Sequence, residues 1–92
     1  MNPFMVVCTF KDGIEMPEIM ALAPQERDAA KALQDDGRLG AVRLATPSRK
    51  VFLEVFARDL EHAQETVVSL PMGPLWNLEI YPLVQPAEIL GK

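Results

Sequence analysis

Residues 39–57, LGAVRLATPSRKVFLEVFA, contain two apolar segments separated by a short polar one. The segments 39–46 and 51–57 are rich in β-branched, aliphatic and aromatic residues, which is typical of strands. The polar residues 47–50 between them supply the turn signals of a hairpin. This stretch therefore predicts two neighbouring antiparallel strands in the middle of the chain.

One helix is expected before this hairpin in the chain and one after it. Residues 16–37 are helical in content, with Pro17 opening a first turn and Pro24 at the first position of the main helix, where its missing N–H costs nothing. Residues 58–70 form a second helix, with Asp59 as its N-cap. The apolar stripes expected to face the sheet are Leu22, Ala29, Ala30 and Leu33 in the first helix, and Leu60, Ala63, Val67 and Leu70 in the second.

Two further strands, at 4–10 and 75–84, complete the pattern. The chain of 92 residues, enough for one domain, then reads strand, helix, strand, strand, helix, strand. This order predicts an α+β, ferredoxin-like fold, with a four-stranded antiparallel sheet and both helices on one face. The expected spatial order is fourth, first, third and second strand. The core is expected over about 4–84, with a C-terminal tail at 85–92.

The sheet face away from the helices is expected to be apolar too. Strand parity places Met5 and Val7 there from the first strand, and Phe52 and Phe56 from the third. Exposed patches of this kind usually mark an interface. The sequence therefore predicts a homodimer or higher homo-oligomer whose subunits cover each other's open faces, as in a dimeric α+β barrel. The alternative is a monomer with an apolar surface.

Turn length and parity together predict the register of the hairpin. Pairing Thr46 with Val51 keeps the apolar residues of both strands on the helix side. The same register places Arg43 directly opposite Glu54 on the open face.

Glu79 and Tyr81 of the last strand are expected on this open face as well. Arg43 would keep Glu54 ionised, whereas burial under a partner would raise the pKa of an unpaired Glu79. A raised pKa is what a general acid–base requires, so Glu79 is the candidate acid or base and Tyr81 a hydrogen-bond donor. The alternative is that these groups form interface hydrogen bonds and a cross-strand salt bridge.

Composition narrows the classes of partner. The net charge is −4 and the basic residues are dispersed apart from 48–50, so no nucleic acid is expected. Neither a signal peptide nor an apolar run near ~20 residues is found, so no membrane partner and a cytoplasmic location are expected. Cys8 is interpreted as a buried small hydrophobe, and the lone His62 as solvated. One histidine and no CxxC pattern predict no metal site.

Residues 70–83, LPMGPLWNLEIYPL, resemble the closing segment of the muconolactone Δ-isomerase family. Both have a leucine–proline pair, an apolar residue, a second proline, and then a strand with an acidic residue that ends in proline–leucine. Residues 32–39, ALQDDGRL, are similar to the family's helix end. The resemblance covers about 4–84 and implies a ferredoxin-like domain that assembles through sheet faces into dimers or larger rings.

The resemblance also implies a proton shift in an unsaturated lactone of aromatic catabolism, with no metal or organic cofactor. Glu79 matches the acidic position of the family's last strand. The family carries a stretch like HLWR in its second strand, whereas residues 41–44 here read AVRL. Ala41 thus replaces the histidine, and Arg43 is displaced by one residue, which changes its face unless a bulge corrects it.

We therefore expect a divergent isomerase-like protein that acts on a small metabolite of aromatic catabolism, one that is anionic or bears a carbonyl or lactone group. Glu79 is expected to be catalytic, and the substrate is expected to contact Arg43, Glu54 and Tyr81. The alternatives are a non-catalytic oligomeric module that binds a small ligand or serves an accessory role, and a cofactor-free monooxygenase of the same superfamily.

Overall fold

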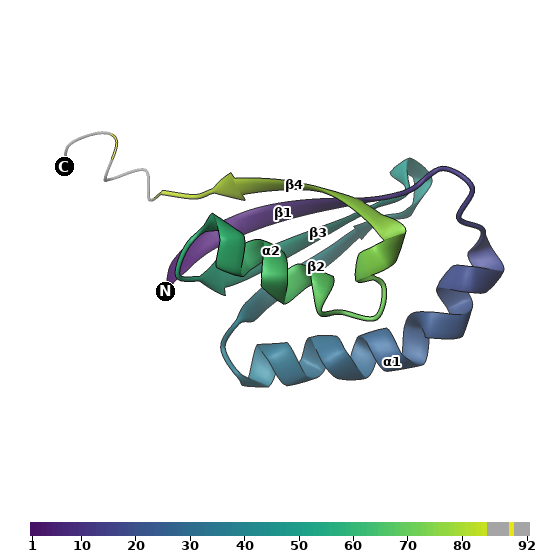
Figure 1. Ribbon diagram of the computed structural model, residues 1–92, viewed down its shortest axis with the longest axis horizontal. Helices are drawn as coiled ribbons and strands as arrows, with labels where there is room; N and C mark the ends of the chain where they lie inside the picture. The colour runs from purple at the N-terminus through teal and green to yellow at the C-terminus, as the bar shows by residue number, and fades with distance from the viewer. Residues whose placement is uncertain (85–88, 90–92) are drawn as a thin grey trace.

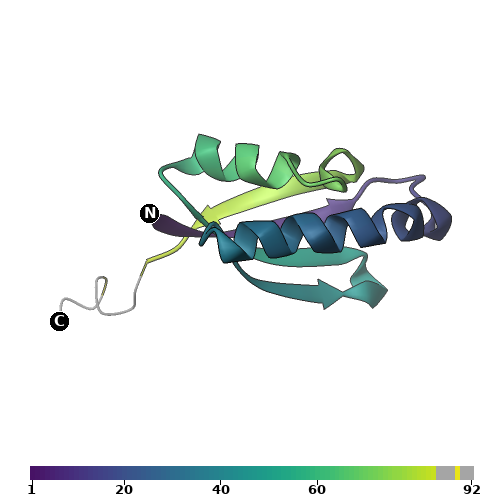
Figure 2. The ribbon, with the colours of Figure 1, turned by 90° about the horizontal axis from the view of Figure 1, so that it is seen from below.

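The computed structural model describes residues 1–84 and 89. Its elements are β1 (Asn2–Phe10), α1 (Met16–Asp35), β2 (Leu39–Ala45), β3 (Lys50–Ala57), α2 (Leu60–Val68) and β4 (Trp76–Pro82), with short 3-10 turns at Thr46–Ser48 and Gly73–Leu75. The antiparallel sheet has the order β2-β3-β1-β4. Both helices cover one face of it (Figure 1), and they lie side by side there (Figure 2). The predicted ferredoxin-like fold is confirmed. The expected tail at 85–92 lies, apart from Ile89, outside the described residues.

Strand parity places the core between the sheet and the helices. In β1 and β3 every second residue is buried, and the residues between them are only partly covered. In β4 the inward side begins with the buried Trp76, whereas Asn77, Glu79 and Tyr81 on the other side are exposed. The predicted faces of all three strands are therefore confirmed. The buried strand residues are Phe4, Val6, Cys8, Val51, Leu53, Val55, Ala57 and Trp76.

Helix α1 is one continuous helix, so the prediction that a main helix begins at Pro24 is wrong. A capping box starts α1 earlier, because the Glu15 N–H donates to Glu18 Oε1 at 3.2 Å and the Glu15 side chain accepts from the N–H of Glu18. Pro24 then lies inside the helix, where it removes one backbone hydrogen bond. Figure 1 shows that α1 is bent, as expected for an internal proline.

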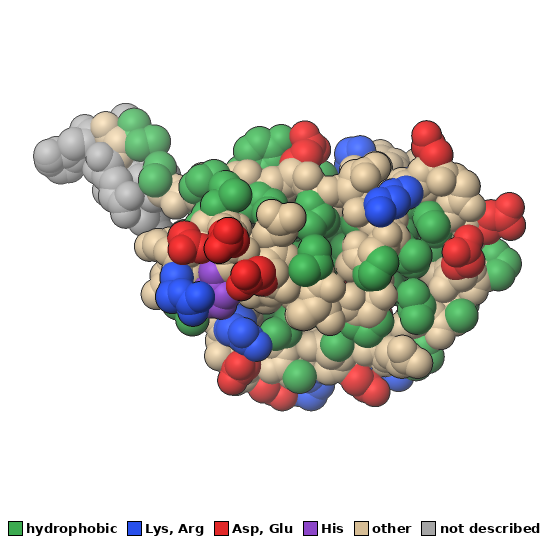
Figure 3. Space-filling view, in the orientation of Figure 1, with side chains coloured by type: hydrophobic (Ala, Val, Ile, Leu, Met, Phe, Trp, Pro, Cys, Tyr) green, Lys and Arg blue, Asp and Glu red, His purple; other side chains and the backbone are tan. Residues whose placement is uncertain are grey.

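The solvent face of α1 carries charges of both signs. Lys31 Nζ lies 3.3 Å from Asp35 Oδ1, one turn further along the helix. Figure 3 shows acidic and basic side chains next to each other along the lower edge of the molecule, where α1 lies. Such exposed pairs contribute little to stability. No helix in the described part of the chain is long and apolar enough to cross a lipid bilayer.

Helix α2 begins as predicted but buries a different face. Asp59 caps it, since its Oδ1 accepts the backbone N–H of His62 at 2.8 Å. His62, expected to be solvated, is only 8 % exposed. Its Nδ1 accepts the Arg58 N–H at 3.0 Å, so the ring folds back over the first turn. Leu60, expected to be buried, is half exposed. The buried face runs instead through His62, Ala63, Thr66 and Val67.

The register between β2 and β3 differs from the predicted one by two residues. Thr46 does not pair with Val51; it begins the turn, and Ala45 pairs with Lys50 instead. The turn ends at Arg49, which adopts the left-handed conformation with φ of 57°. Because the shift is an even number of residues, the side chains of β2 keep their predicted faces.

The expected pairing of Arg43 with Glu54 is consequently wrong. Arg43 lies opposite Phe52. Between Leu39 and Val42, β2 has two residues, Gly40 and Ala41, where β3 has only Glu54. This extra residue forms a bulge in β2. Glu54 Oε1 accepts the Ala41 N–H at 3.3 Å. A Cβ at Gly40 would meet that same oxygen, so a larger residue there would displace the end of the Glu54 side chain.

Replacing Gly73 with alanine is expected to destabilise the fold by about 2–3 kcal/mol, the usual cost of overpacking. Gly73 is buried, and a Cβ there would lie 2.7 Å from the Val68 carbonyl oxygen and 2.9 Å from its Cα. Backbone atoms cannot rotate away, so the turn or the end of α2 must move. Urea unfolding of Gly73→Ala and of the wild type measures the difference.

A Gly13→Ala variant is the matched control. Gly13 has φ of +89°, and a methyl group added there would meet no atom within 4 Å, so only backbone strain of about 1 kcal/mol is expected. A loss at Gly73 no larger than the loss at Gly13 would contradict the expected packing clash.

Candidate functional site

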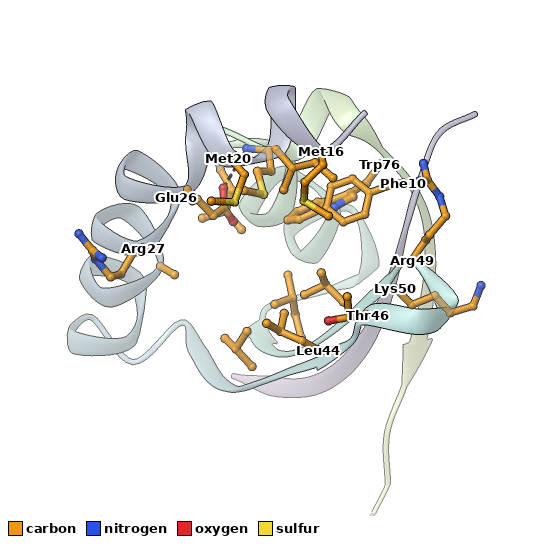
Figure 4. Close-up of a pocket in the computed structure, with 18 of the residues that line it drawn as sticks. Phe10, Met16, Met20, Glu26, Arg27, Leu44, Thr46, Arg49, Lys50 and Trp76 are labelled. Atoms are coloured by element: carbon orange, nitrogen blue, oxygen red, sulfur yellow. Dashed lines mark hydrogen bonds between the residues drawn. The ribbon is translucent and has the colours of Figure 1, made fainter. Parts of the chain in front are cut away.

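A cavity of about 750 Å³ lies between α1 and the inner face of the sheet. Its walls come from α1, β2, the start of β3, the end of β1, the turn after α2 and the start of β4 (Figure 4). This volume is in the range of sites that bind small molecules. Val42 and Leu44 face it from β2 and are exposed, Leu44 by 72 %, although the sequence places them in the core. The cavity, and not a packed core, lies under that edge of the sheet.

Glu26 is the one acidic residue among those that line this cavity in the described part of the chain. Figure 4 shows its side chain reaching inward from α1. Its Oε1 accepts the backbone N–H of Met72 at 2.8 Å. Burial raises the pKa of Glu26 above its ordinary value of 4.5, and the Met72 N–H lowers it by a smaller amount. The site therefore consists of a half-buried carboxyl group in a largely apolar wall.

Glu26 is a functional candidate that the sequence predictions miss. The signal is nevertheless present in the helical spacing. Glu26 lies three and four residues after Ala23 and Leu22, and three and four residues before Ala29 and Ala30. Side chains with this spacing share one face of a helix. A carboxylate inside an apolar stripe is therefore a detectable sign of a buried acid.

The four residues predicted to form the site lie on the opposite face of the sheet. The register aligns Arg43, Phe52, Val7 and Glu79 in one row across the four strands. Glu54 lies in the neighbouring row, opposite Met5, which itself pairs with Tyr81. None of the four predicted residues lines the cavity.

Of these four residues, the structure brings Glu79 and Tyr81 together. The Tyr81 hydroxyl donates a hydrogen bond to Glu79 Oε2 at 3.0 Å, at the exposed edge formed by β4. That bond, and then the negative charge of Glu79, raise the pKa of Tyr81 above its ordinary value. Arg43 is separated from Glu79 by two strands, or roughly 14 Å between backbones at the usual strand spacing.

The Glu79–Tyr81 bond can be measured directly because Tyr81 is the only tyrosine. Replacing Glu79 with glutamine removes the negative charge that holds the hydroxyl proton. We expect the pKa of Tyr81 to fall towards its ordinary value, which a spectrophotometric titration of the phenolate measures. Glu54→Gln is the control, because Glu54 bonds to the Ala41 N–H. An unchanged titration in Glu79→Gln would show that the bond is absent in solution.

Cys8 is buried, as the sequence predicts. Burial, together with the charge of Glu26, raises the pKa of its thiol to about 12. The thiol therefore keeps its proton at neutral pH, and a protonated buried thiol is a poor nucleophile.

The fold and the cavity define a class: a ferredoxin-like α+β domain with a cavity of small-molecule size between its helices and its sheet. Among solved structures, the crystal structure of muconolactone isomerase has a similar fold, with a TM-score of 0.73 over 92 % of this chain and 92 % of that chain. The sequences are 22 % identical, so the likeness shows a common fold. No family model and no curated protein sequence matches this chain. The predicted muconolactone isomerase-like fold is confirmed.

Proposed function

We propose that this protein is an isomerase of aromatic catabolism, which moves a proton within a small carbonyl or lactone metabolite without a cofactor. The observation that carries the proposal is the carboxyl group of Glu26 in the apolar wall of the cavity. General acid–base catalysis is most efficient when the pKa of the group lies near the working pH. Burial shifts the pKa of Glu26 in that direction.

In the proposed reaction Glu26 acts first as base and then as acid. One oxygen removes a proton from the carbon next to the carbonyl group, and the electrons of that C–H bond pass into a dienolate. The protonated Glu26 then returns the proton to the far end of the dienolate, so that the double bond moves. Oε1 is held by the Met72 N–H at 2.8 Å, so we assign the transfer to Oε2.

The dienolate oxygen needs a hydrogen-bond donor, and we assign this role to Trp76. Trp76 lines the cavity, and its indole N–H is buried without a hydrogen-bond partner among residues 1–84 and 89. Leaving a buried donor unpaired is unfavourable. The nitrogen has no surface open to the cavity, so the ring must turn before a ligand oxygen can accept from it; that bond would be strongest when the oxygen carries the charge of the dienolate.

A second candidate keeps Glu79 as the catalytic residue, with Arg43, Glu54 and Tyr81 around the substrate. The hydrogen bond from Tyr81 to Glu79 favours it, because it orients the carboxylate. This candidate requires another subunit to close a cleft over the outer face. A non-catalytic binding or accessory module would instead use the cavity with Glu26 only holding the Met72 turn. The cofactor-free monooxygenase and the cytoplasmic location stay predictions.

We further propose that two copies pair through their outer sheet faces. Met5, Val7, Phe52 and Phe56 are only partly covered there, and a second copy would bury them. Arg43 and Glu79 lie at opposite ends of one row of this face. A two-fold axis parallel to the strands would set Arg43 of one subunit over Glu79 of the other, so this face is complementary in charge to itself.

Incubation with α-angelica lactone in deuterated buffer tests the proposed reaction. This small neutral lactone becomes a conjugated isomer when one proton moves. We expect faster conversion than in buffer alone, as followed by NMR. Deuterium should enter at the carbon that gains the proton to the extent that the proton on Glu26 exchanges with solvent before it is returned. Binding without conversion or exchange would favour the non-catalytic module. Oxygen consumption with an electron-rich phenol would favour the monooxygenase.

A further inference from the structure

The cavity wall includes four basic residues, but their charged groups are held elsewhere. The guanidinium of Arg49 donates to the carbonyl oxygens of Lys11 and Ile14, at 3.2 and 3.1 Å. The ammonium of Lys50 donates to Thr9 Oγ1 at 3.3 Å, on the outer side of the sheet. Figure 4 shows both side chains pointing away from the cavity. These two residues therefore contribute their stems and backbone to the wall, not their charges.

The two basic residues of α1 are likewise directed to solvent. Lys31 pairs with Asp35 at 3.3 Å, and its side chain is 73 % exposed. Arg27 lies beside Asp28 with 78 % of its side chain exposed, and Figure 4 shows it on the far side of the helix. The one charged group that points into the cavity is thus the carboxyl group of Glu26.

We propose that this cavity selects neutral, largely apolar ligands and rejects organic anions of the same size, an inference that rests on the proposed function of the cavity. An anion would lose its hydration against apolar walls without gaining a cationic partner, and such burial is strongly unfavourable. When ionised, Glu26 would also repel it. The substrate class is then a neutral ketone, enone or lactone, and a carboxylate-bearing metabolite is excluded.

Two fluorescent probes that differ by one sulfonate group test this selection. N-phenyl-1-naphthylamine is neutral, and 1-anilinonaphthalene-8-sulfonate is the same amine with a negative charge. We expect the neutral probe to bind at least about tenfold more tightly, as measured by its fluorescence increase. Ala23→Phe, which fills the cavity, should abolish binding, whereas Ala32→Phe on the exposed side of α1 should not.

An introduced arginine shows whether the difference in affinity between the two probes comes from charge or from the greater hydrophobicity of the neutral probe. Leu44→Arg places a guanidinium in the cavity wall, whereas Asn77→Arg adds the same charge on the exposed outer face. We expect only Leu44→Arg to strengthen binding of the sulfonate, by about tenfold. A wild-type protein that binds the sulfonate as tightly as the amine, or an unchanged Leu44→Arg, would overturn the selection and leave the cavity as a binding site. If neither probe binds, the cavity is not a ligand-binding site, and the proposed function is overturned with it.

Discussion

Replacing Glu26 with glutamine is expected to slow the conversion of α-angelica lactone by about 10²–10⁴-fold, the usual contribution of a general acid–base. Glutamine keeps an oxygen that can accept the Met72 N–H, now seen at 2.8 Å. The carboxamide of glutamine neither gains nor loses a proton near neutral pH, so it cannot act as a general acid or base. The variant should therefore fold and bind the lactone but should not transfer the proton. Rates from NMR and unfolding curves from urea titration measure the two effects separately.

Glu79→Gln is the matched control, because it makes the same chemical change on the other face of the sheet. We expect its rate to stay within a few-fold of the wild type. The reverse pattern, with a large loss in Glu79→Gln and none in Glu26→Gln, would establish the assignment made from sequence. Glu26→Ala adds a third comparison, since it also removes the bond to the Met72 N–H. A loss of rate in the alanine variant alone would make Glu26 a structural residue.

The stability of the same variant gives a second readout that needs no substrate. The pKa of Glu26 is raised in the folded protein, so the fold favours the protonated form. Its stabilising contribution is complete below the ordinary value of 4.5 and is lost as the pH rises through the higher folded value. The wild type should therefore lose stability relative to Glu26→Gln as the pH rises from acid to neutral. A difference that stays constant over this range would contradict the raised pKa.

Replacing Phe52 with aspartate is expected to raise the dissociation constant of the proposed dimer by at least about 10²-fold, since it removes a large apolar side chain from the interface and places a charge there. Phe52 lies in the middle of the outer face, between Arg43 and Val7 in the same row. It points away from the helix-side core, so the subunit itself should remain folded, as circular dichroism can show. Sedimentation velocity of both proteins across the micromolar range measures the association.

Asn77→Asp is the control for this experiment, because it adds the same charge at the exposed edge formed by β4. Charge exchange tests the proposed two-fold axis. Arg43→Glu and Glu79→Arg should each weaken the dimer, and the double variant should recover part of the loss. A wild type that stays monomeric at micromolar concentration would refute the proposed dimer, and a double variant no better than the singles would refute the axis.

The sequence alone predicts the element order, the fold and the side of the sheet on which each strand residue lies. These features depend on local periodicity, because side chains alternate along every strand whatever its neighbours are. The Asp59 cap could be predicted for a similar reason, since it satisfies an N–H only three residues away. The muconolactone isomerase-like fold could be expected because residues 70–83 resemble the closing segment of that family. That segment is again a local pattern, a turn followed by one strand.

Register, burial on helices and the cavity depend on contacts between distant segments. A left-handed Arg49 and a bulge at Gly40 move β2 against β3, and so separate Arg43 from Glu54. The continuation of α1 through Pro24 and the folding of His62 over its own helix turn depend instead on local bonds: the capping box at Glu15 and the bond from the Arg58 N–H to His62.

The candidate site shows most clearly which features follow from the sequence alone and which depend on the tertiary structure. The sequence by itself determined that Glu79 and Tyr81 share the outer face, because parity is fixed along one strand. Only the tertiary structure decided that α1 leaves a cavity over β2 and that Glu26 projects into it. The gap between a helix and a sheet edge depends on how residues far apart in the chain pack, and no local period encodes that distance.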